Sequence, residues 1–151
     1  MSPTGGRHGR LVTHLATELE LFARETGRGW VLSGEVGIYT RREPDTVRGA
    51  DVAFLSKSRS PNEPSEGFLE TPPGLVIEVL SPSDRMPEPS DKLSDYFSAG
   101  VEQVWVVRPE DRCVQVWTSL DARREYAAED RIDGEDVLAG FSLAVGDLFG
   151  A

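Results

Sequence analysis

The sequence predicts an α/β (α+β) fold, a mixed β-sheet with helices packed on it. A long amphipathic stretch comes first, several short apolar runs follow, and a second helical stretch precedes two apolar runs joined by a tight turn. Because helices and strands do not alternate strictly, this order favours a mixed sheet over a regular βαβ repeat. With 151 residues, no internal repeat and no shift in composition, the chain is expected to form a single domain over residues 1–151.

The first helix is predicted from apolar residues that recur at helical spacing, namely Leu11, Leu15, Leu19 and Phe22. Gly27 is a usual helix stop, and residues 1–9 are expected to be a turn-rich lead. The two histidines, His8 before the helix and His14 within it, are expected to be structural or solvent-facing.

The predicted strands are short runs rich in β-branched and aromatic residues, at 30–32, 34–39, 50–55, 74–80, 103–107 and 113–117, with an edge strand at 124–127. Two loops rich in proline are expected at 56–73 and 82–89. Ser90 is a plausible N-cap for the second helix, which should end at Gly100. The apolar segment 141–149 is expected to dock onto the body.

Charge and composition exclude some function classes. The net charge of −10 and the sequence pI of about 4.6 argue against a broad basic surface that coats nucleic acid, though not against an enzyme with one cationic site. No apolar stretch approaches the roughly 18 residues of a membrane span, and the N-terminus has no apolar signal region, so we expect a cytoplasmic protein. The single cysteine, Cys113, is expected to be a core or interface residue.

Asp51 and Glu78 are the candidate chemical pair. Glu78 stands in the middle of the apolar run 74–80, and a buried ionised carboxylate is costly unless it is paired or bound to metal. If the two strands are neighbours, the carboxylates could share a cation such as Mg²⁺, with Lys92 reaching back from the second helix. The alternative is structural: Asp51 caps a strand end and Glu78 meets an arginine in the core.

Four segments carry a family resemblance: Ser-Pro-Thr-Gly-Gly-Arg-His-Gly-Arg-Leu at 2–11, Ala-Asp-Val-Ala-Phe at 50–54, Gly-Leu-Val-Ile-Glu-Val-Leu-Ser-Pro-Ser-Asp at 74–84, and the stretch from Asp-Lys-Leu at 91 to Arg-Pro at 109. Together they resemble the Uma2 family of the PD-(D/E)xK nuclease superfamily. The resemblance implies a restriction-endonuclease-like mixed sheet flanked by helices, DNA as substrate and Mg²⁺ (or Mn²⁺) as cofactor. It implies Asp51 and Glu78 as the acidic positions, the backbone carbonyl of Val79 as a further metal ligand, and Lys92 as the catalytic lysine.

The sequence departs from the family pattern at three places. Ala50 stands where the superfamily's proline is expected. Leu80 occupies the ordinary lysine position of the motif, so activity depends on Lys92 reaching the site. An N-terminal segment usual in the family, which often supplies a glutamate, is not seen before Ser2, and Glu35 is a candidate to replace that glutamate as a metal ligand.

Two functions of different class follow from these residues. The first is a metal-dependent endonuclease that hydrolyses DNA, and the second is a catalytically weak or inactive relative that acts as a binding or regulatory module. We also predict a homodimer, because the strands at 104–107 and 114–117, with Trp105 and Trp117, would present exposed apolar edges in a monomer.

Overall fold

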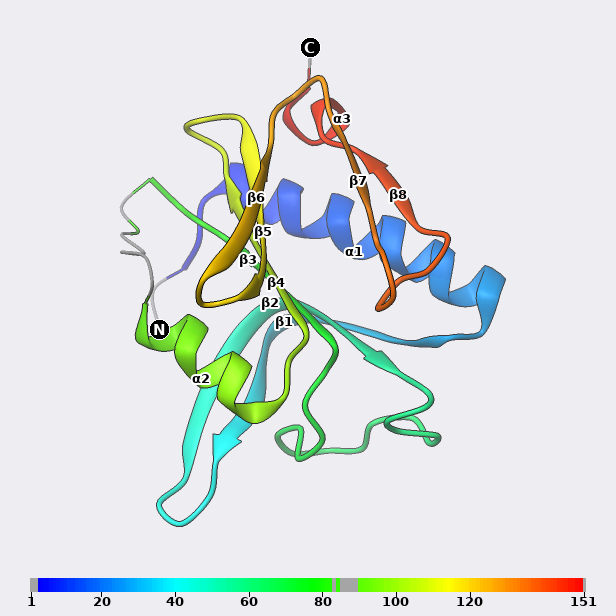
Figure 1. Cartoon of the computed structure of the whole chain (residues 1–151), viewed down its shortest axis with the longest axis vertical. Helices are drawn as coiled ribbons and strands as arrows, with labels where there is room; N and C mark the ends of the chain where they lie inside the picture. The colour runs from blue at the N-terminus through cyan, green and yellow to red at the C-terminus, as the bar shows by residue number, and fades with distance from the viewer. Residues whose placement is uncertain (1–2, 83, 85–89, 151) are drawn as a thin grey trace.

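The computed structural model describes residues 3–82, 84 and 90–150, and a six-stranded sheet forms its centre (Figure 1). In spatial order, which is also chain order, its strands are β1 (Gly29–Arg41), β2 (Thr46–Ser56), β3 (Leu75–Val79), β4 (Gln103–Arg108), β5 (Cys113–Ser119) and β6 (Ala122–Tyr126). Only β3 and β4 run parallel, and the other neighbours are antiparallel. The predicted mixed sheet is therefore confirmed, and the parallel pair needs a crossover, which contains helix α2 (Asp91–Ala99).

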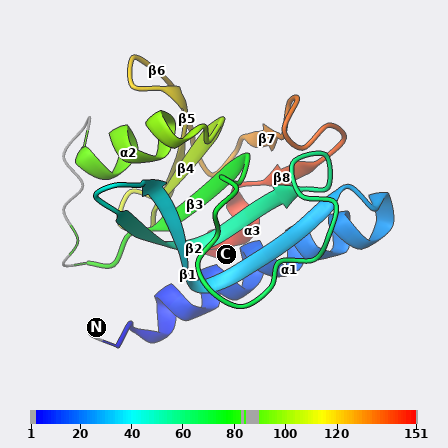
Figure 2. The same ribbon diagram turned by 90° about the horizontal axis from the view of Figure 1, so that it is seen from below.

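Helices cover the two faces of the sheet. Helix α1 (Gly6–Thr26) and α2 lie on opposite sides of it (Figure 2). The α1 layer buries Leu11, Leu15 and Leu19 against one face, and the α2 layer buries Leu93 and Tyr96 against the other. The amphipathic pattern of each helix thus has a physical cause, since each has one face to bury.

The N-terminal elements differ from their prediction in extent. Helix α1 begins at Gly6, so residues 6–9 are helical and His8 lies in the first turn; the predicted stop at Gly27 is confirmed by its left-handed φ of 66°. The two strands expected at 30–32 and 34–39 are one strand, β1, with an irregular register between Ser33 and Val36. Because β2 begins at Thr46, Asp51 lies in mid-strand and not at a strand start.

The expectation of exposed apolar edges is wrong. Strands β4 and β5 lie inside the sheet, and Trp105 and Trp117 are 0% and 4% exposed. The edge beyond them is β6, whose exposed residues include Arg123 and Arg124. The homodimer stays a prediction, but the exposure on which it depended is absent.

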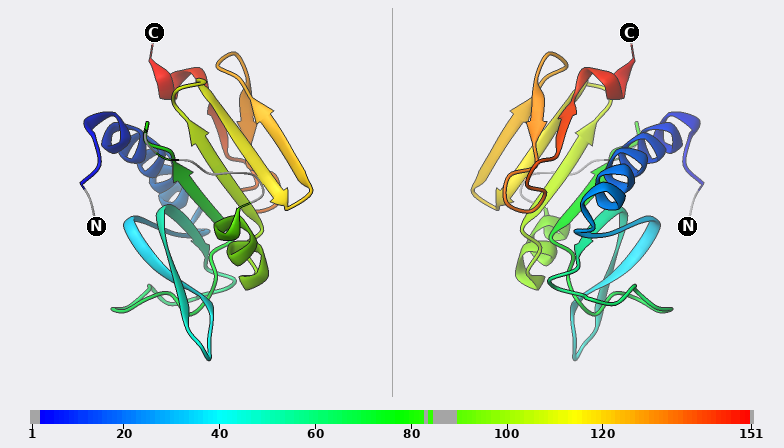
Figure 3. Two further views of the ribbon diagram at one scale, coloured as in Figure 1. Left: turned by 90° about the vertical axis from the view of Figure 1, so that its left-hand side faces the viewer. Right: turned by 90° about the vertical axis from the view of Figure 1, so that its right-hand side faces the viewer.

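The C-terminal segment packs against α1, as expected for residues 141–149. It forms strand β8 (Ser142–Ala144) and the short helix α3 (Gly146–Phe149), and β8 pairs with β7 (Arg131–Asp133), which the sequence pattern did not predict. Its apolar side chains extend the α1 layer of the core. The ribbon of this segment is red in Figure 3. Most of the second expected loop, 82–89, lies outside the described residues. None of the described helices is long and apolar enough to cross a membrane.

Candidate functional site

The candidate site lies where β2 and β3 stop pairing. The last pair of their antiparallel ladder is Val52 with Ile77, so the next residues along the same register are Asp51 and Glu78. Their exposed fractions are only 6% and 5%. Two carboxylates from segments far apart in the sequence are therefore buried side by side, as the order of the strands predicts.

Helix α2 supplies the groups that contact Glu78. The hydroxyl of Tyr96 donates a hydrogen bond of 2.7 Å to Oε1 of Glu78, and Nζ of Lys92 lies 3.1 Å from the same oxygen. The helix starts at the predicted N-cap, where Oγ of Ser90 accepts the N–H of Leu93 at 3.2 Å. Lys92 therefore reaches the strand, whereas Leu80 packs partly buried against the core on the α2 side.

Burial determines the proton affinity of Glu78. Burial raises the pKa of Glu78 to about 7, although Lys92 and Tyr96 act to lower it; the nearby charge of Asp51 raises it further. Burial also raises the pKa of the Tyr96 hydroxyl, and the charge of Glu78 adds to that effect. Together the two carboxylates carry more negative charge than the single lysine offsets, so the site favours either a proton or a further cation.

Asp51 is held through one of its two oxygens. Oδ2 accepts the backbone N–H of Val79 at 2.8 Å and lies 3.3 Å from Nε2 of His8 in the first turn of α1. Val79 lies past the last residue pair of the β2–β3 ladder, so the side chain of Asp51 takes the place of a backbone partner there. The N–H of Val79 therefore lies beside Asp51 at the end of β3, one residue after Glu78.

One oxygen of each carboxylate has no hydrogen-bond partner among the described residues: Oδ1 of Asp51 and Oε2 of Glu78. Buried polar atoms are nearly always satisfied, so each of these atoms requires an explanation. Carboxylate and carbonyl oxygens are the ligands that Mg²⁺ prefers, and that ion commonly takes one or two protein carboxylates and fills its remaining positions with water or phosphate. In the described part of the chain, no group of three or more His, Cys, Asp or Glu side chains could hold a metal. An ion bound here would therefore need water or phosphate oxygens as its remaining ligands.

Glu35 does not join the pair in a group that could hold a metal ion. It is an exposed residue with φ of 61° at the irregularity of β1, and its carboxylate lies against Gly49 of β2.

Of the turn residues after β3, Ser81 donates both its N–H and its hydroxyl to Asp84, at 2.8 and 2.7 Å. These two bonds lower the pKa of Asp84, and the charges of His8 and Lys92 act in the same direction.

Two residues of the site were missed by the sequence analysis. Tyr96 stands four positions after Lys92, so the two share a helix face, and this spacing could have identified it. His8 offered no such signal, because its contact with Asp51 joins residues 43 apart and the predicted helix began after it. Of the two positions expected for His8, the structural one is observed and the solvent-facing one is wrong, since its side chain is only 10% exposed and lies 3.3 Å from Asp51.

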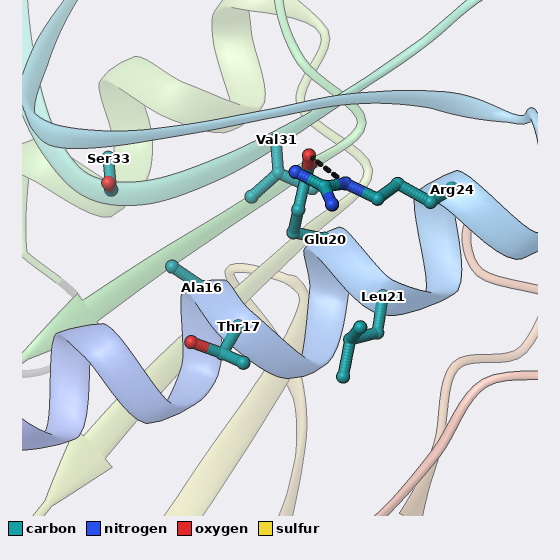
Figure 4. A pocket seen from close by; sticks show the side chains of 7 residues that line it. All are labelled: Ala16, Thr17, Glu20, Leu21, Arg24, Val31 and Ser33. Atoms are coloured by element: carbon teal, nitrogen blue, oxygen red, sulfur yellow. Dashed lines mark hydrogen bonds and ion pairs between the residues drawn. The ribbon is translucent and has the colours of Figure 1, made fainter.

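Two hollows lie on the α1 side of the molecule. One, of about 440 Å³, lies between α1 and β1, and its lining holds an exposed ion pair of 3.0 Å between Arg24 and Glu20 (Figure 4). The other, of about 190 Å³, is lined by the first turn of α1, including His8, and by residues 80–82 after β3. Of these two hollows, the second adjoins the candidate site, because His8 lines it and also contacts Asp51.

The comparisons with known proteins bear on the fold and the family of the chain. A crystal structure described as "a putative nuclease belonging to DUF820" from Anabaena variabilis is similar, with a TM-score of 0.83 over 99% of this chain and 83% of that chain. At 16% identity this likeness shows the fold alone. None of the curated proteins compared with the chain matches it. Residues 1–146 match the model of the family described as "Uma2: Putative restriction endonuclease", and because that match spans nearly the whole sequence, the chain belongs to the Uma2 family.

Proposed function

We propose that the protein is a metal-dependent endonuclease that hydrolyses phosphodiester bonds of DNA, with Mg²⁺ or Mn²⁺ held by Asp51, Glu78 and the backbone carbonyl of Val79. The observation that carries the proposal is the pair of buried carboxylates, each with one oxygen that has no partner among the described residues. The family description reads "Putative restriction endonuclease", and the similar crystal structure is described as "a putative nuclease"; the family description supports DNA as the substrate class.

Each residue of the site has a role that follows from its position. When bound, the ion would supply Lewis-acid polarisation of the phosphoryl oxygen and a more acidic water. Lys92 is 29% exposed while its ammonium lies 3.1 Å from Glu78, so it could also contact a substrate phosphate and neutralise charge in the transition state. The surrounding apolar strands exclude water and strengthen these electrostatic interactions.

Cleavage of closed circular and linear plasmid DNA tests the proposal. The wild-type protein should nick or linearise the circle with Mg²⁺ or Mn²⁺ and leave it intact with EDTA. Asp51→Asn, Glu78→Gln and Lys92→Met should each lower the rate roughly 100-fold or more. The matched control is Lys57→Met, which removes the only other lysine, a residue whose ammonium lies 4.7 Å from the ring centre of Trp30.

Two outcomes would contradict the proposal. The first is a wild-type protein that cleaves no DNA with either metal ion. The second is cleavage by Glu78→Gln at the wild-type rate, which would show that any activity comes from another site or a contaminant.

A second candidate is a binding or regulatory module without catalysis. Leu80 stands where a nuclease motif usually has lysine, and Lys92, which would replace it, is already paired with Glu78. DNA or partner binding without metal-dependent cleavage would favour this second candidate. Binding of Mn²⁺ by calorimetry that disappears in Asp51→Ala would favour the nuclease.

A further inference from the structure

The hydrogen bonds of the two carboxylates share one arrangement. In each, one oxygen receives donors and the other receives none from the described residues. Oδ2 of Asp51 receives the backbone N–H of Val79 and faces His8, and Oε1 of Glu78 receives Tyr96 and Lys92. The side-chain donors come from α1 for one carboxylate and from α2 for the other, that is, from opposite faces of the sheet.

His8 is held firmly enough to orient Asp51. An ionised carboxylate can only accept hydrogen bonds, so Nε2 of His8 carries the proton in their contact of 3.3 Å. The preceding residue, Arg7, donates to the carbonyl of Pro109 at 2.9 Å, and Leu11 and Leu15 bury the next turns of the helix. The first turn of α1 is therefore tied to the body of the protein on both sides of His8.

The position of the Tyr96 side chain is likewise fixed by its contacts. Its side chain is fully buried, its hydroxyl lies 2.7 Å from Oε1 of Glu78, and the same hydroxyl is 3.4 Å from the carbonyl of Gly49 in β2. One residue earlier, Asp95 forms an ion pair of 2.7 Å with Arg48, also in β2. The helix face that carries Tyr96 is thus fixed against the strand that carries Asp51.

We propose that His8 and Tyr96 are positioning residues, which hold one oxygen of Asp51 and of Glu78 so that the two remaining oxygens converge on one divalent cation. The inference rests on the proposed function and adds to it the two residues that organise the cation site. Groups that hydrogen-bond metal ligands, carboxylates included, typically change metal affinity or activity 10–100-fold when they are removed.

Calorimetric titration of Mn²⁺ into the metal-free protein tests the inference without any measurement of activity. Tyr96→Phe removes only the hydroxyl, and His8→Leu removes the donor; each should weaken Mn²⁺ binding about 10–100-fold. His8→Gln places an amide N–H near the position of Nε2 and should restore the affinity to within about threefold of wild type, whereas loss of packing alone would not be rescued in this way. Circular dichroism verifies that each variant is folded.

The chain offers matched controls. His14→Leu removes the other histidine, which lies 4.0 Å from Glu18 on the same helix, and Tyr126→Phe removes a hydroxyl from β6. Both should bind Mn²⁺ as the wild type does. Wild-type affinity in both His8→Leu and Tyr96→Phe would overturn the inference and leave the proposed function intact. A wild-type protein that binds no Mn²⁺ would overturn both the inference and the proposed function.

Discussion

Replacement of Glu78 by Gln should remove a specific part of the pH dependence of stability. Burial raises the pKa of Glu78 from 4.5 to about 7 in the folded protein. Below pH 4.5 the carboxyl is protonated in both folded and unfolded chains. Between the two pKa values the folded chain keeps a proton that the unfolded chain has lost. The stabilisation from this group is therefore complete at low pH and is lost as the pH rises through about 7.

The magnitude follows from the shift. A displacement from 4.5 to about 7 corresponds to about 2–3 kcal/mol between pH 5 and pH 8, at 1.36 kcal/mol per pKa unit. The glutamine side chain resembles the protonated carboxyl in shape and charge. At pH 8 the Glu78→Gln variant should therefore be more stable than the wild type by about 2–3 kcal/mol, or roughly 5–10 °C in Tm. At pH 5 the two proteins should melt at nearly the same temperature.

Thermal melts of both proteins in EDTA, from pH 5 to pH 8, measure this difference without a divalent cation. The control is Glu102→Gln, which replaces a half-exposed carboxylate 3.2 Å from Arg59, outside the site. Its difference from wild type should not change with pH in the way predicted for Glu78. A Glu78→Gln variant that is less stable than wild type at pH 8 would refute the assignment of burial as the dominant influence on this carboxyl.

Three further predictions follow from the same contacts. Lys92→Met removes the cation that lowers the pKa of Glu78, so the pH at which the stabilisation from Glu78 is lost should rise above about 7. The same thermal melts measure this pH, and Lys57→Met should leave it unchanged. Ser90→Ala removes the N-cap of α2 and should lower the unfolding free energy by about 1 kcal/mol in urea titrations, whereas Ser98→Ala near the end of that helix should have little effect. Leu15→Ala leaves a cavity at a residue that is 1% exposed and should lower the unfolding free energy by about 2–5 kcal/mol in the same titrations. Leu21→Ala, at a residue that is 56% exposed, should lower it much less.

The secondary structure that local patterns predict is largely the one observed. The helical spacing of Leu11, Leu15 and Leu19 and the stop at Gly27 correspond to α1. The N-cap at Ser90 was predicted because a hydroxyl oxygen at that position can accept a free N–H of the first turn. The start of α1 was missed, because Gly6 and Gly9 have low helix propensity and docking of the first turn compensates for it.

The sheet interior shows where local patterns are insufficient. Runs such as 103–107 are apolar whether they lie at an exposed edge or in the middle of a sheet, so periodicity alone cannot place them. In the structure β6 covers β5, and Trp105 and Trp117 are buried. The same limit explains the missed strand β7, which has three residues and only one buried side chain, Ile132.

The sequence by itself determined which groups could form the site: a carboxylate inside the apolar run of β3, a second in β2, and Lys92 on the helix between β3 and β4. Backbone hydrogen bonding and side-chain period act over a few residues, so these elements are encoded locally. Tertiary structure alone decided that His8 meets Asp51 across 43 residues, that Tyr96 shares Glu78 with Lys92, and that Glu35 does not join the pair in a group that could hold a metal ion. Those contacts depend on how whole helices pack on opposite faces of the sheet, and packing is a property of the assembled core that no short segment specifies.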